Sequence, residues 1–179
     1  MSHRFTIDAL KELIAARRDA EQGLRICIEH VRERRLRTLL MSRLHECAQA
    51  QQELQSLVRL LGGEPAVAAP ESAAVRRRWA DLRVSLLEAS EAGGAGEARA
   101  ALACNEDGVI LDECERGESR ALEVYRNALD DPLPGLVRAV VLRQFEDVMT
   151  NHDQIRDLRS QPSLRADLGA GNGAQAGPH

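Results

Sequence analysis

The stretch Ile28–Leu40, IEHVRERRLRTLL, is the key to the architecture, because the hydrophobic stripe of the chain changes face within it. Up to Val31, an inward seam recurs at three- and four-residue spacing, through Ile7, Leu10, Ile14, Arg17, Glu21, Leu24, Ile28 and Val31. Continuing that register would place Arg35, Thr38, Ser42, His45, Gln49 and Gln52 inside. The apolar residues are instead Leu36, Leu40, Leu44, Cys47, Leu54, Val58 and Leu61. The first 61 residues, with no proline and one glycine, are therefore predicted to form two helices that reverse near Glu33–Leu36.

The rest of the chain is predicted to contain three more helices. Gly62 and Gly63 end the second helix as C-terminal caps should, and residues 64–71 form a connection with two prolines. Ser72 caps a short helix whose apolar side is Val75, Trp79, Leu82 and Leu86. Residues 92–96 are a break, and a long helix follows over about Asn105–Leu129, ended by Asp131 and Pro132. The last helix starts at Pro134 and runs to about Arg159.

Two helical hairpins joined by a crossover that carries a short helix predict an all-α fold, an antiparallel four-helix bundle. We expect one domain over residues 1–160. The Gly-, Ala- and Pro-containing residues 161–179 have little to bury and are expected to form a flexible tail.

Composition excludes several classes of protein. The 179 residues are 44% apolar but only 2% aromatic, which favours helices over a β-sandwich or barrel. A net charge of −4 argues against a nucleic-acid binder, and no apolar run is long enough to span a membrane. The start of the chain lacks the apolar stretch of a secretory signal, so we expect a cytoplasmic protein.

Signatures of catalysis are also missing. Lys11 is the only lysine, so the chain after residue 11 contains neither the lysine of a Walker phosphate loop nor a lysine that could form a Schiff base. Neither a Ser/His/Asp or Cys/His arrangement nor a dinucleotide fingerprint occurs, so the sequence favours a protein that is not an enzyme.

Two further features have ordinary structural interpretations. The four cysteines, Cys27, Cys47, Cys104 and Cys114, form no Cys-x-x-Cys pair and are expected to be reduced, buried thiols. The run Arg76–Trp79 is basic and amphipathic, which would suit an acidic membrane or a nucleic acid. Because Trp79 belongs to the apolar stripe of its helix, the preferred interpretation is a core tryptophan with arginines on a solvated face.

The most informative positions are polar residues on the inward seams, since a buried polar group needs a partner. Every long helix is predicted to carry at least one: Glu21, Gln51, Glu115, Glu118 and His152. Reversal of the hairpins near residues 34 and 132 sets Gln51 within one turn of the level of Glu21, and Glu115 within one turn of the level of His152.

Four segments together resemble a proteobacterial family of ferritin-like four-helix-bundle proteins. They are Ile110–Glu118 (ILDECERGE), Leu60–Pro65 (LLGGEP), Trp79 in the short helix, and His152–Arg159 (HDQIRDLR). The resemblance covers about residues 7–160 and implies a ferritin-like bundle, without an assigned activity. The chain departs from the family pattern at the first reversal, where Arg32–Arg35 replaces an Asp-Pro break.

A ferritin-like di-iron centre needs single glutamates from two helices and Glu-x-x-His pairs from the other two. Glu21 and Glu115 suit the single glutamates, but Ala48 and Met149 stand where the paired glutamates would be. The remaining set, Glu21, Glu115, Glu118 and His152 with Gln51 in support, would hold at best one iron, manganese or zinc ion. The other interpretation is a buried network, with Arg17 or Arg25 neutralising Glu21 and His152 bonded to Glu115.

Two functional hypotheses result. In the first, the protein is a non-catalytic bundle that acts through its surface or by self-association as a homo-oligomer, in stress physiology if the resemblance is a guide. In the second, it is a degenerate ferritin-like metalloprotein that reacts with oxygen or peroxide. The first predicts no cofactor.

Overall fold

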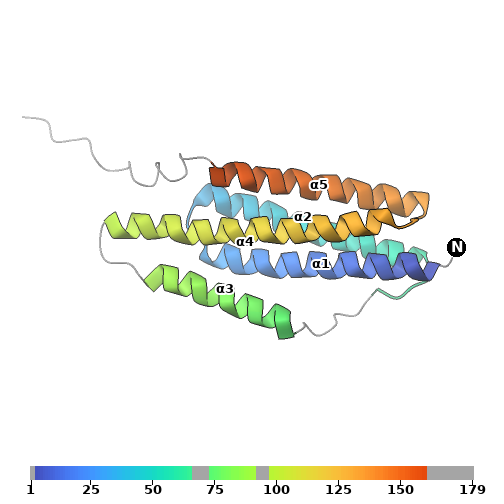
Figure 1. Cartoon of the computed structure of the whole chain (residues 1–179), viewed down its shortest axis with the longest axis horizontal. Coiled ribbons are helices and arrows are strands. Elements are labelled where there is room, and N and C mark those ends of the chain that lie inside the picture. The colour runs from blue at the N-terminus through green and yellow to red at the C-terminus, as the bar shows by residue number, and fades with distance from the viewer. Residues whose placement is uncertain (1–2, 66–72, 92–96, 161–179) are drawn as a thin grey trace, which may run out of the picture.

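The structure, a computed structural model, describes residues 3–65, 73–91 and 97–160, with side chains described from 76 to 88 and from 106 onward in the last two ranges. These residues form five helices and no strand: α1 (His3–His30), α2 (Arg34–Leu60), α3 (Ala73–Glu91), α4 (Glu97–Asp130) and α5 (Gly135–Ser160) (Figure 1). The all-α prediction is confirmed. No helix in this part of the chain is long and apolar enough to cross a membrane.

Several predicted features lie outside the described residues. These are the connection over 66–72 with the Ser72 cap, the Val75 side chain, the break over 92–96, the Cys104 side chain, and the tail over 161–179. Gly62 is described, and its φ of 77° gives the left-handed turn that the predicted C-terminal cap of α2 requires.

The reversal between α1 and α2 is where the change of hydrophobic face predicts it. Glu33 caps α2, and its carboxylate accepts hydrogen bonds from the backbone N–H groups of Arg35 and Leu36. Asp107 of α4 reaches the same turn and accepts from the backbone N–H of Arg32 at 3.2 Å. The turn is therefore stabilised both by its own cap and by the neighbouring hairpin.

The second hairpin follows the prediction at its reversal, with α4 ending at Asp130 and α5 beginning at Gly135. The start of α4 differs, since the helix begins at Glu97 rather than near Asn105. The added segment, EARAALA over 97–103, consists of residues with high helix propensity, which explains why the helix extends this far.

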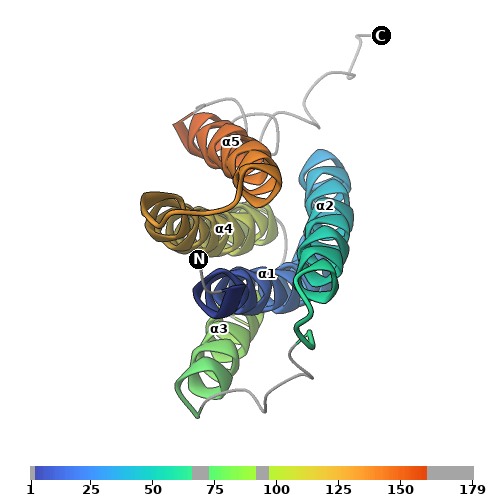
Figure 2. The ribbon, with the colours of Figure 1, turned by 90° about the vertical axis from the view of Figure 1, so that its right-hand side faces the viewer.

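Helix α3 lies along the outside of the bundle, against α1 and α4 (Figure 2). Trp79 is buried, as predicted, and its ring occupies the space that a side chain at Gly23 of α1 would need. Arg78 pairs with Asp19 of α1 at 2.7 Å. Of the preceding arginines, Arg76 and Arg77 are exposed.

The buried apolar residues of the bundle form two separate clusters. One includes Leu24 and Cys27 of α1 and extends to Trp79, Leu82 and Leu86 of α3. The other lies towards the opposite end of the long helices, and its buried members are Leu10, Leu13, Ile14, Leu54, Leu57, Val58, Ala121, Tyr125, Ala128, Val137, Val141 and Val148.

Between these clusters, each long helix contributes polar residues, which we call the polar layer: Arg17, Glu21, Gln51, Glu118, Asn151 and His152.

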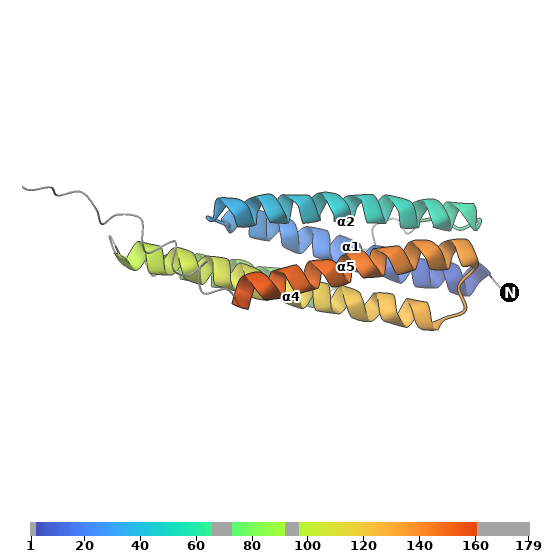
Figure 3. The same cartoon turned by 90° about the horizontal axis from the view of Figure 1, so that it is seen from above.

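The bundle is open along one side. α1 packs on α2 and α4, and α4 packs on α5, whereas the backbones of α2 and α5 scarcely approach each other. Figure 3 looks onto this side, and Figure 2 shows the same opening end-on. The two helices are joined instead by polar side chains that extend from the polar layer.

Candidate functional site

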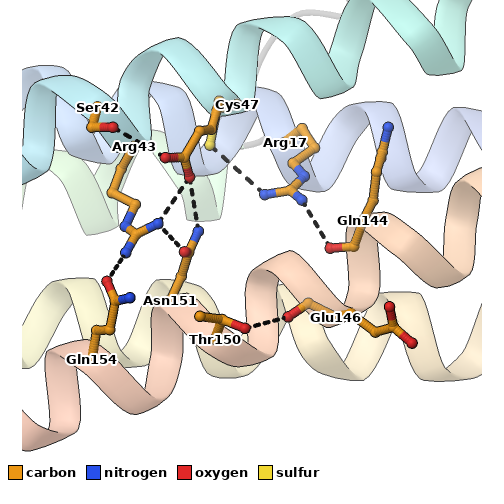
Figure 4. A network of polar contacts seen from close by, with 10 residues as sticks. Arg17, Ser42, Arg43, Cys47, Gln144, Glu146, Thr150, Asn151 and Gln154 are labelled. Carbon is orange, nitrogen blue, oxygen red and sulfur yellow. Dashed lines mark hydrogen bonds and ion pairs between the residues drawn. The ribbon is translucent and has the colours of Figure 1, made fainter.

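Arg17 of α1 is a buried cation that contacts three other helices. Its Nε donates to the Tyr125 hydroxyl at 2.8 Å, and the hydroxyl in turn donates to Gln144 Oε1 at 2.6 Å. The guanidinium also lies 3.8 Å from Cys47 Sγ and 3.5 Å from the Gln144 carbonyl (Figure 4). Burial raises the pKa of Cys47 to about 11, although Arg17 opposes the shift, so this thiol stays protonated near neutral pH.

Arg43 joins α2 to α5 at the open side. Its guanidinium donates to Asn151 Oδ1, to Gln154 Oε1 and, at 2.9 Å, to Glu46 Oε2 (Figure 4). Asn151 Nδ2 also donates to Glu46, at 3.2 Å, which closes a small ring of hydrogen bonds. The Nε of Arg43 is buried without a partner among the described residues. Arg43 is thus held in place while one donor atom remains unsatisfied.

A polar groove of about 460 Å³ runs between α2 and α5 over these residues. Its lining includes both buried arginines and the pair Glu53–Arg143, whose charged atoms lie 2.7 Å apart. Gln144 Nε2 donates to the same Glu53 oxygen at 2.7 Å. The described residues that line the groove are Arg17, Leu39, Ser42, Arg43, Glu46, Gln49, Ala50, Glu53, Arg143, Gln144, Asp147, Thr150, Asn151 and Gln154.

Glu21 lies in the neutralised environment that the network interpretation predicts. Arg25 NH2 donates to one carboxylate oxygen at 2.6 Å, and Gln51 Nε2 donates to the other at 2.6 Å. Partial burial by itself would raise the pKa of Glu21, but the hydrogen bonds from Arg25 and Gln51 lower it. The predicted proximity of Gln51 to Glu21 is confirmed.

The predicted bond between His152 and Glu115 is replaced by other contacts. Glu115 pairs with Arg159, and His152 Nδ1 lies 3.5 Å from Asp153 Oδ1. The contact between Tyr125 and Gln144 sets α5 about one turn further along α4 than a reversal at residue 132 implies. Both Glu115 and Glu118 are then within one turn of the level of His152, and Glu115 differs from the prediction in its partner, Arg159.

Glu118 is the carboxylate of the polar layer that most lacks partners. Within the part of the chain that the structure describes, its side chain makes no hydrogen bond or ion pair. Burial raises its pKa, while the nearby positive charges of Arg17 and Arg43 lower it, and His152 contributes in the same direction. Burial therefore disfavours the charge of the Glu118 carboxyl group, and two buried guanidinium groups favour it.

Sequence reasoning missed Arg43, Tyr125, Gln144 and Asn151 as members of the network. The sequence did contain a signal for Gln144 and Asn151. They follow the three- and four-residue spacing of a buried face, together with Val137, Val141, Val148 and Ile155. Asn151 takes the inward position assigned to His152, which is only partly buried. Both residues fit between Val148 and Ile155, so spacing alone could not choose between them.

The side chains that could bind a metal ion lie apart from one another in the structure. No group of three or more His, Cys, Asp and Glu residues in the described ranges is arranged to hold an ion. Of the four predicted ligands, Glu21 is bonded to Arg25 and Glu115 to Arg159. Glu118 and His152 are therefore the two predicted ligands whose side chains are not bonded to an arginine.

Comparison with known proteins identifies a family. Residues 5–131 match a family model described as a domain of unknown function, DUF2383, which covers α1 to α4 and ends at the second reversal. No curated protein matches the chain.

Proposed function

The chain belongs to the DUF2383 family, a domain of unknown function, and we propose that it is a non-catalytic helical bundle that acts by self-association through the groove between α2 and α5. The observation that supports this proposal is the open side of the bundle. There, two helices are bridged by polar side chains instead of packing directly, and the buried donor Arg43 Nε has no partner among the described residues.

Charge favours a second copy of the chain as the occupant. The groove carries three arginines and three carboxylates: Arg17, Arg43, Arg143, Glu46, Glu53 and Asp147. A surface that pairs with its own copy must be complementary to itself. Turning a second copy about a two-fold axis parallel to the groove sets its α5 over the first copy's α2, which brings Arg143 of one copy towards Glu53 of the other.

Charge reversal tests this pairing. We expect the wild-type chain to dimerise with rising concentration in sedimentation velocity, and Glu53→Arg to weaken dimerisation at least about tenfold. Combining Glu53→Arg with Arg143→Glu should restore it, because the opposite charges again face each other. Glu123→Arg, on an exposed site of α4 outside the groove, is the matched control and should leave the dimer intact.

A wild-type chain that stays monomeric at all concentrations would contradict the proposal. The same is true of a Glu53→Arg variant that associates as the wild type does. Melting curves of each variant separate lost association from lost folding. A role in stress physiology rests on the family resemblance alone.

A second candidate function is a metal site in a ferritin-like bundle core. Its support is Glu118, a largely enclosed carboxyl group without a hydrogen bond in the described residues, with His152 near enough to influence its pKa. A divalent cation at this carboxylate would also be repelled by the guanidinium groups of Arg17 and Arg43, which already supply positive charge nearby.

Metal analysis distinguishes the two candidates. Protein purified without an affinity tag is loaded with iron(II), manganese(II) or zinc, desalted and analysed for bound metal. Near-stoichiometric metal that is lost in Glu118→Gln and in His152→Ala supports the metal site. Glu115→Gln is the control, because that carboxylate is paired with Arg159. Absence of retained metal in a folded wild-type chain rules this candidate out.

A further inference from the structure

Cys27 of α1 and Cys114 of α4 face each other in the core beneath α3. Both side chains are buried in the same apolar cluster, and the Cys27 thiol is near enough to affect the pKa of the Cys114 thiol. Both also line a cavity of about 30 Å³ that Trp79 of α3 borders. Two cysteines from different helices therefore border one small cavity, at a point where a third helix covers them.

Contacts on either side of the two cysteines hold Cys27 and Cys114 opposite each other, independently of the thiols. On one side, Arg17 bonds to Tyr125; these residues lie ten before Cys27 and eleven after Cys114, respectively. On the other side, Arg32 pairs with Glu106, five residues after Cys27 and eight before Cys114. Because these contacts hold α1 and the turn that follows it against α4 in antiparallel register, the two cysteines stay opposite each other.

We propose that Cys27 and Cys114 are a site of reversible disulfide formation, oxidised by a small peroxide that gains access when α3 moves away from α1. The bond would join the first hairpin covalently to the second. This inference is independent of the groove and of any metal ion.

The chemistry balances with one peroxide molecule. One thiol, as its thiolate, attacks a peroxide oxygen and breaks the O–O bond, which gives a sulfenic acid and, after protonation, water. The second sulfur then attacks the sulfenic sulfur, forms the S–S bond and releases a second molecule of water. The two thiols are oxidised, the peroxide is reduced, and an external dithiol reverses the reaction.

The rate should depend strongly on pH. The neighbouring Cys27 thiol, together with burial, raises the pKa of the Cys114 thiol above its ordinary range, so the reactive thiolate is scarce at neutral pH. Oxidation is therefore expected to be slow near pH 7 and to accelerate as the pH rises.

Access depends on α3, which is attached through the buried Trp79 and through the ion pair of Arg78 with Asp19. Trp79 is buried, and its indole Nε1 lacks a partner among the described residues, which weakens the gain from docking the ring. The attachment also relies on the bare backbone at Gly23, where an added Cβ would lie 2.5 Å from Trp79 Cη2. Gly23→Ala is thus a means of displacing the cover without touching either cysteine.

The test uses the reduced full-length chain and hydrogen peroxide. We expect intact mass to fall by about 2 Da, two thiols to be lost, and peptide mapping to link Cys27 to Cys114. Cys27→Ser and Cys114→Ser should each prevent the link. Cys47→Ser is the matched control, since Cys47 is also buried between helices but contacts Arg17, and it should leave the link unchanged. Cys104→Ser serves as a second control.

Gly23→Ala tests the route of access. We expect this variant to form the same link at least about ten times faster than the wild type. A rate equal to that of the wild type would overturn the role of α3. Failure to form the Cys27–Cys114 link in both the wild type and Gly23→Ala, with circular dichroism showing folded helices, would overturn the site itself.

Discussion

At Gly23 the backbone of α1 makes room for the Trp79 ring, and this single position controls how α3 is attached. Gly23→Ala places a Cβ 2.5 Å from the ring, so we expect a loss of about 1–3 kcal/mol in unfolding free energy. Because Trp79 is the chain's only tryptophan, its fluorescence should shift to the red as the ring becomes exposed.

Gly117→Ala in α4 is the matched control, since an added Cβ there meets nothing within 4 Å. It should stabilise the helix by roughly 0.5–1 kcal/mol, because alanine is the better helix former. Equal effects of the two substitutions in urea unfolding would show that the contact with Trp79 is unimportant.

Glu21 and Glu118 both belong to the polar layer, yet they should respond to pH in opposite directions. The lowered pKa of Glu21 means that its stabilising contribution is present above the ordinary value of 4.5 and is lost as the pH falls through the folded-state pKa. The raised pKa of Glu118 means that its charge becomes unfavourable as the pH rises from 4.5 through its folded-state pKa.

Glu21→Gln should therefore cost about 0.5–1.5 kcal/mol at pH 7 and less at pH 4, since the wild-type carboxylate loses its charge in acid. Glu118→Gln should be more stable relative to the wild type at pH 7 than at pH 4. Unfolding free energies from urea titrations at both pH values check each sign. Parallel behaviour of the two variants would contradict this assignment of their environments.

At the scale of the elements, the α1–α2 turn depends on a side chain from the other hairpin. Asp107 of α4 accepts a hydrogen bond from the backbone N–H of Arg32. Asp107→Ala should cost about 0.5–1.5 kcal/mol, because this donor loses its acceptor. Hydrogen exchange at the amide of Arg32 should accelerate in the same variant.

Asp107→Asn is the control, because the amide oxygen can still accept a bond from Arg32. Its exchange rates should stay nearer to those of the wild type. If Asp107→Ala leaves exchange at the turn unchanged, the Glu33 cap alone is sufficient to form it.

At the scale of the whole molecule, the polar layer divides the core into two apolar clusters and joins the hairpins. The chain of contacts through Arg17, Tyr125 and Gln144 is expected to specify how the helices align more than to stabilise them. Tyr125→Phe alone should cost about 1–3 kcal/mol, because Arg17 and Gln144 each lose a partner.

Arg17→Met, Tyr125→Phe and Gln144→Leu combined should cost less than the sum of the three single substitutions, since none of the three side chains then leaves another of the three unpaired. Urea unfolding of the singles and the triple measures this difference. Strict additivity would show that the three side chains act independently.

Local sequence patterns were sufficient to predict most of the helices and their ends. The change of hydrophobic face at Ile28–Leu40 predicted the first reversal, and glycine and proline positions predicted the end of α2 and the second reversal. These features are local, because side-chain spacing and backbone restrictions act within a few residues. The same spacing identified Arg17, Glu21 and Gln51 as inward polar residues.

Which of those residues meet was settled by the packing of the helices. Helix crossing and loop geometry set α5 about one turn from its expected level along α4, and Glu115 pairs with Arg159 instead of His152. The opening between α2 and α5 was equally invisible in the sequence. A helical pattern specifies the face on which a residue lies, whereas the distance between two faces depends on how every helix in the bundle packs.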